Sequence, residues 1–152
     1  MRNSSQSLTP SVSLILRKIS DDKTLALFSS IAIANDIDKC IQLKQMNLTT
    51  KQYYFRISGL VDAGLIKRLK KRYSLTALGK VVYHSLMILG KTLSYYWKLR
   101  AIESVESVGS AGFSGFSNEQ MKQVIAALID DNQVKELLMN SVSSTSTSTS
   151  ET

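Results

Sequence analysis

The fold of this chain is decided by residues 48–78, which read LTTKQYYFRISGLVDAGLIKRLKKRYSLTAL. Thr49 is a typical helix N-cap, and Gln52 follows it at the spacing of a capping box. Apolar residues then recur at steps of four and three, and Gly64 stands where a helix commonly ends. A basic stretch follows, and Thr76 can cap another helix. This order predicts a helix, a tight turn, a two-stranded β-hairpin and a second helix.

The hairpin is expected to pair residues 65–69 with residues 72–75 around a two-residue turn. Five of the six residues from Lys67 to Arg72 are Lys or Arg. Because side chains alternate along a strand, only two or three of these cations should face the same way. A charged run is usually only a solubilising surface. Five cations on one hairpin with no acidic residue nearby nevertheless favour a polyanionic partner.

The positive charge of the chain is concentrated around this stretch. Residues 39–102 contain 13 of the 19 basic residues and a single acidic residue, Asp62, so this segment carries +12 while the whole chain carries +7. Such a local excess is typical of a protein that binds phosphate groups.

The composition limits the other classes of function. The only cysteine and the only histidine, Cys40 and His84, cannot complete a tetrahedral zinc site within one chain, so neither a metal nor a cofactor is expected. Cys40 has the spacing of a core residue. No catalytic constellation is present, and we expect no enzymatic activity. The longest uncharged apolar stretch, residues 81–90, is too short to span a bilayer, and we expect a soluble, cytoplasmic protein.

The remaining helices follow from caps and apolar periodicity. Asn47 is expected to end one of them in the left-handed conformation. Among the consecutive aromatic residues Tyr95, Tyr96 and Trp97, we expect Tyr96 or Trp97 to lie in a core or a dimer seam. The helices are expected at residues 21–33, 36–46, 76–107 with a bend near Gly90, 117–129, and from Asp130 or Asp131 to about Met139.

Three segments carry a resemblance to a known family: ISDDKTLALF at 19–28, MNLTTKQYYFRISGLVDAGLI at 46–66 and YSLTALGKVVY at 73–83. Residues 95–104 and 127–138 add to it. With these segments the chain resembles archaeal winged helix-turn-helix transcriptional regulators of the ArsR-like superfamily. The resemblance implies DNA binding, with the helix of residues 49–64 in the major groove. Several relatives sense metals through clusters of Cys and His, which this chain lacks.

The expected fold is therefore mostly α with a small β-hairpin, as a winged helix-turn-helix domain with a C-terminal helical extension. The chain should divide into a partly flexible N-terminal extension (1–18), the DNA-binding domain (19–90), a helical extension for dimerisation or partner binding (91–140) and a disordered Ser/Thr tail (141–152). The expected partners are double-stranded DNA and a second copy of the chain, with no membrane. The sequence identifies no small-molecule effector.

Arg56 is expected to read guanine, and Gln52 could read adenine unless its cap role occupies it. Phe55 could instead pack on a neighbouring helix or a dimer partner. The rival functions are a winged-helix module for protein interactions in a larger assembly and non-specific binding of nucleic acid such as RNA. The expected DNA-binding residues are Thr50, Lys51, Gln52, Tyr54, Phe55, Arg56, Lys67, Arg68, Lys70, Lys71 and Arg72.

Overall fold

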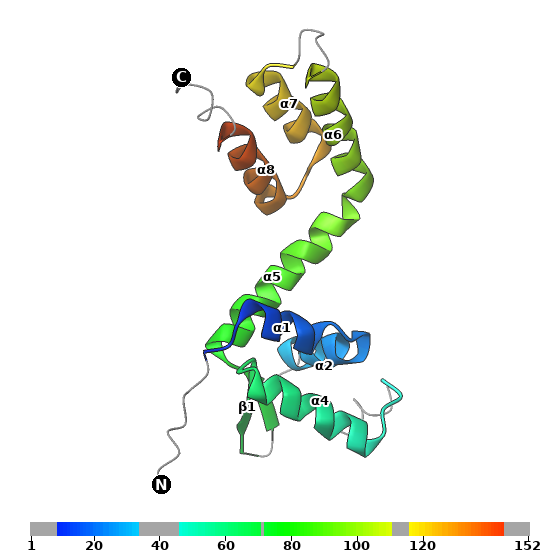
Figure 1. Cartoon of the computed structure of the whole chain (residues 1–152), viewed down its shortest axis with the longest axis vertical. Coiled ribbons are helices and arrows are strands. Elements are labelled where there is room, and N and C mark those ends of the chain that lie inside the picture. The colour runs from blue at the N-terminus through cyan, green and yellow to red at the C-terminus, as the bar shows by residue number, and fades with distance from the viewer. Residues whose placement is uncertain (1–8, 34–45, 71, 111–115, 145–152) are drawn as a thin grey trace. The chain divides into compact units, whose positions relative to one another are not determined.

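A computed structural model describes residues 9–33, 46–70, 72–110 and 116–144 (Figure 1). In this part of the chain the protein is mostly helical with one small antiparallel hairpin, which confirms the expected fold class at that level. The elements are α1 (Val12–Ile19), α2 (Asp22–Ile33), α4 (Thr50–Asp62), β1 (Ile66–Leu69), β2 (Arg72–Leu75), α5 (Ala77–Ser94), α6 (Tyr96–Ser110), α7 (Asn118–Leu128) and α8 (Asn132–Ser144).

The chain divides into two compact units, Met1–His84 and Ser85–Thr152. The division falls inside α5, earlier than the boundary after residue 90 that the sequence indicated. The first unit also contains α1, which contacts both α2 and α4. The segment before residue 19 therefore contributes a helix to this unit.

The core of the first unit is built from α2, α4 and the start of β1. Its fully buried side chains include Leu27, Phe28 and Leu60. The beginning of α5 joins this core, because the ring of Tyr83 meets the ring of Phe28 edge to face, with 6.3 Å between centroids. These contacts fix one side of α4 and leave its other side free of the core. The buried apolar residues of this unit are Ile19, Leu27, Phe28, Ile31, Leu48, Tyr53, Ile57, Leu60, Ala63, Leu65 and Ile66.

Both ends of α4 are closed as the sequence predicts. The Thr49 side chain accepts the N–H of Gln52, and the Gln52 side chain accepts the N–H of Thr49. At the other end Gly64 adopts a positive φ of 70°, and the N–H of Leu65 donates to the carbonyl of Leu60. This pattern is a Schellman motif. It requires the left-handed conformation at the residue after the helix, and glycine adopts that conformation at little energetic cost.

The hairpin is locked onto the start of α5 through the carbonyl group of Leu65. The N–H of Thr76 donates to this carbonyl at 3.0 Å, while the Thr76 hydroxyl caps α5 by accepting the N–H of Gly79. A Cβ at Gly79 would overlap the carbonyl oxygen of Leu65 and lie 2.9 Å from its carbon. Glycine is therefore required here by the close approach of the helix to the backbone before β1.

The second unit has its own apolar core, which α6, α7 and α8 share. Ser117 and Gln120 form the expected capping box of α7, and Asp131 caps α8 by accepting the N–H of Val134. Lys91, near the end of α5, forms an ion pair of 2.9 Å with Asp131. The hydrogen bonds from Lys91 and from the backbone hold the pKa of Asp131 below its usual value. The buried core residues are Ile102, Met121, Ile125, Ile129, Val134 and Val142.

The bounds of two helices in this unit differ from the expected ones. The long helix is interrupted at Tyr95, between α5 and α6, and is continuous through Gly90. Tyr95 packs on the core, while Tyr96 and Trp97 are exposed, so neither of the latter is a core residue and their place in a dimer seam stays a prediction. In addition, α8 continues past Met139, to Ser144.

Several expectations concern residues outside the described ones. They are the helix of residues 36–46, of which only residue 46 is described, the core position of Cys40, the DNA contact of Lys71 and the disorder of the tail from residue 145. Asn47 itself is described and has the expected positive φ, 49°. None of the described helices has the length and apolar character that a membrane crossing requires.

Candidate nucleic-acid interface

The candidate interface is built on the side of α4 that faces away from the core. Tyr53, Ile57 and Leu60 are buried and define the inner side of the helix. Thr50, Lys51 and Gln52 at the first turn, and then Tyr54, Phe55 and Ser58, are all exposed. At about 100° per residue, Phe55 lies about 200° from Tyr53, which places it almost opposite the core. Its side chain is 78% exposed.

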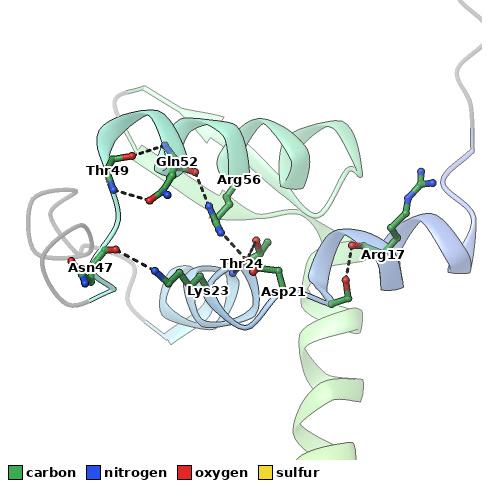
Figure 2. Close-up of polar contacts among 9 residues, drawn as sticks. Arg17, Asp21, Lys23, Thr24, Asn47, Thr49, Gln52 and Arg56 are labelled. Carbon is green, nitrogen blue, oxygen red and sulfur yellow. Dashed lines mark hydrogen bonds and ion pairs between the residues drawn. The ribbon is translucent and has the colours of Figure 1, made fainter.

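Arg56 takes a different position from the outward one that the sequence suggested. It follows Tyr53 by three residues, so it lies only about 60° from the buried side of the helix. Its side chain is 18% exposed, and its Nε donates to Oδ2 of Asp21 at 3.0 Å. Figure 2 shows the guanidinium turned toward the start of α2. Arg56 therefore links the two helices in this structure.

Asp21 is the centre of this link. Its Oδ2 accepts both the N–H and the hydroxyl of Thr24, each at 2.9 Å, and so caps α2 while it binds Arg56 (Figure 2). The hydrogen bonds from Thr24 and then from Arg56 hold the pKa of Asp21 below its usual value. A carboxylate at a helix N-terminus is also favoured by the helix dipole. One ionised group thus orients α4 relative to α2.

The segment that leads into α4 is held in place by a second contact with α2. Nζ of Lys23 donates to the carbonyl of Asn47 at 3.3 Å (Figure 2). The capping box then occupies the side-chain oxygen of Gln52. An adenine contact that needs this oxygen would have to break the cap, so the structure favours the capping role of Gln52.

Tyr54 is partly exposed, at 48%, and its ring is supported by the ring of Tyr53. The two centroids lie 5.6 Å apart with an interplanar angle of 77°, an edge-to-face contact. Burial of Tyr53 raises its pKa to about 12, so its hydroxyl stays protonated at neutral pH. Tyr54 therefore lies at the edge of the exposed side of α4, where its ring packs against the ring of Tyr53.

The basic hairpin forms as predicted, with Lys67 opposite Ser74 and Leu69 opposite Arg72. Directly opposite residues of an antiparallel pair share one face, so Lys67, Leu69 and Arg72 lie on one face of the hairpin. Arg68 lies on the other face. All four of these side chains are exposed, and Lys70 is exposed at the turn with a φ of 56°.

The hairpin and α4 belong to the same unit, and β1 contacts α4 (Figure 1). The exposed cations of the hairpin therefore lie on an element that contacts α4. Figure 1 shows the hairpin beside the end of the helix that Gly64 closes. Among the expected DNA-binding residues of α4, Arg56 alone is not exposed, because it is turned toward Asp21.

Two features of the site are absent from the expected DNA-binding residues. Ser58 lies on the exposed face one turn after Phe55 and Tyr54, where apolar periodicity places it, yet it is not among them. The ion pair between Asp21 and Arg56 joins residues that are 35 positions apart in the chain, so no local sequence pattern predicts it. His84 is exposed, and among the described residues no group of His, Cys, Asp and Glu could hold a metal ion.

Comparison with protein-family models, characterised proteins and solved structures finds no match for this chain. Its function must therefore be inferred from the geometry and chemistry of its own residues.

Proposed function

We propose that this protein is a transcription regulator that binds double-stranded DNA through a winged helix-turn-helix in its first unit. In this proposal α4 enters the major groove, and the hairpin of β1 and β2 lies on the phosphate backbone or in the minor groove. The resemblance of residues 19–83 to archaeal regulators of the ArsR-like superfamily supports the same function.

The observation that carries the proposal is the placement of charge. Residues 39–102 carry +12, and the exposed cations of the hairpin lie on an element whose first strand contacts α4. Lys67, Arg68, Lys70 and Arg72 are all exposed on a hairpin of two four-residue strands. Exposed cations repel one another, so such a cluster is best explained by a partner that supplies negative charge.

The two elements would divide the work of recognition. Phosphate contacts from the hairpin and from Lys51 fix the position of the protein on the duplex, and they carry no sequence information. Base edges would be read by the exposed side chains of α4 that point away from the core, mainly Phe55 and Ser58. Arg56 would not contact guanine directly, as the sequence suggests. Its ion pair with Asp21 would instead fix the orientation of α4 and of its exposed side chains.

Selection of binding sites from a library of random duplexes tests this proposal directly. We expect the full chain to enrich one motif, because a helix in the major groove meets a distinct pattern of donors and acceptors at each base pair. Enrichment of duplexes without a shared motif would indicate non-specific nucleic-acid binding. Failure to retain any duplex, at low salt, would favour the rival role as a protein-interaction module.

A homodimer is the second proposal, and a separate observation supports it. Leu89 and Leu93 lie one helical turn apart on α5, Trp97 lies in the first turn of α6, and all three are exposed. The exposure is 63% for Leu93 and 80% for Trp97. Apolar side chains at helical spacing in water are a common mark of an association surface. A second copy of the chain would cover them.

A further inference from the structure

We propose that Phe55 recognises the C5-methyl group of thymine in the major groove, which makes it a specificity-determining residue of the interface. The inference rests on the proposed DNA binding. It names the base that Phe55, the side chain of α4 almost opposite the core, would read. It concerns a contact of apolar character, whereas the charged residues of the site contact mainly phosphates.

The position of Phe55 on α4 is the first step. The buried residues Tyr53, Ile57 and Leu60 fix which side of the helix faces the core. Phe55 lies about 200° around the helix from Tyr53, and so projects almost directly away from the core. A major groove is about 12 Å wide and about 8.5 Å deep, so the side chain opposite the core is the one that reaches its floor.

The chemistry of the groove is the second step. Among the base edges of unmodified DNA in the major groove, the thymine methyl is the apolar feature, and phenylalanine is one of the side chains that contact it. The ring of Phe55 cannot donate or accept a conventional hydrogen bond, so a polar base edge beneath it would lose its hydration without a replacement. A thymine methyl under the ring avoids this cost.

The surroundings of Phe55 are the third step. Exposure of a single apolar residue is common and by itself needs no explanation. Phe55, however, has Lys51 one turn before it and Ser58 one turn after it, both exposed. A cation and a hydroxyl on either side suit a polar, negatively charged groove, and they do not suit an apolar protein surface.

Deoxyuridine provides the test, because it differs from thymidine only in the missing methyl group. In the duplex selected by the full chain, each thymine is replaced singly by deoxyuridine, and affinity is measured by fluorescence anisotropy. We expect about fourfold weaker binding at one position, the effect of burying about one methyl-sized group. The Phe55→Ala variant should bind the thymine and deoxyuridine duplexes equally at that position. Val12→Ala, which also shortens a highly exposed apolar side chain of the first unit, should keep the wild-type difference.

The outcomes separate the inference from the proposed function. If the wild-type protein retains no duplex, both fall. If it binds a motif but no deoxyuridine duplex is weakened, or if the motif lacks thymine, only the role of Phe55 is overturned. Full sensitivity to deoxyuridine in Phe55→Ala would overturn it as well. The wild-type measurement stands without the variant, so it decides the question even if Phe55→Ala folds poorly.

Discussion

Replacement of Gly79 by alanine should destabilise the first unit strongly. A Cβ at this position would overlap the carbonyl oxygen of Leu65 and lie 2.9 Å from the carbonyl carbon. Both atoms are backbone, so the helix or the hairpin must move. That movement would disturb the hydrogen bond from the N–H of Thr76 to Leu65, 3.0 Å long.

The magnitude follows from these two effects. Overpacking in a close-packed region typically costs about 1–3 kcal/mol, and a hydrogen bond contributes about 1 kcal/mol net. We therefore expect a loss of about 3 kcal/mol in the free energy of unfolding. For a unit of fewer than 100 residues this corresponds to a fall of about 12–24 °C in the unfolding midpoint. DNA affinity should fall too, because Leu65 connects the end of α4 to the hairpin.

Gly90→Ala is the matched control, since Gly90 lies in the same helix and a Cβ there would meet nothing within 4 Å. Because Gly90 belongs to the second unit, this variant should leave the first unit unchanged and raise the stability of the second by about 0.5–1 kcal/mol, since alanine favours the helix interior. Circular dichroism gives the midpoints, and hydrogen exchange assigns the loss to residues 1–84. Equal stability of Gly79→Ala and the wild-type protein would refute the reasoning from close approach.

Three further predictions concern the charges and the second unit. Lys67→Gln with Arg72→Gln should weaken binding to all duplexes similarly and lower the salt slope by up to about two; a changed base preference would contradict a phosphate role. Because the pKa of Asp21 is lowered in the folded protein, its carboxylate stabilises the fold at pH 7. That contribution is present above the usual pKa of about 4 and is lost as pH falls through the lower pKa of the folded state, so urea midpoints of wild type and Asp21→Asn should differ at pH 7 and approach each other as the pH is lowered below about 4; a constant difference would exclude the charge effect. Leu93→Glu should give a monomer in sedimentation, whereas Leu137→Glu, 60% exposed on α8, should stay dimeric; a monomeric wild-type protein would end the dimer proposal.

The local elements of the fold could be predicted from the sequence because their signals lie within a few residues. Thr49 and Gln52 specify the start of α4, and Gly64 specifies its end. The hairpin register follows from the short distance between its strands. The break of the long helix at Tyr95 could not be predicted in this way, since neither proline nor glycine marks it.

The contents of the candidate site were predictable as a set of residues, but the orientation of Arg56 was not. Its position directly before the buried Ile57 suggests an outward direction, whereas the helical period puts it near the buried side, three residues after Tyr53. From this position the guanidinium of Arg56 donates to the carboxylate of Asp21, which lies 35 residues earlier in the chain. A contact of this kind depends on how α2 packs against α4, and that is decided by the core.

Affinity for duplex DNA as a function of salt concentration tests the central claim most directly. With roughly 5–8 phosphates neutralised by the hairpin and α4, log K should fall linearly with log salt, with a slope of about −4.5 to −7. The full chain and a fluorescent duplex carrying the selected motif are sufficient for the titration. A steep line within this range is the result that DNA binding through the charged surface of the first unit predicts. No binding at about 50 mM salt, or an affinity that does not change with salt, would contradict it.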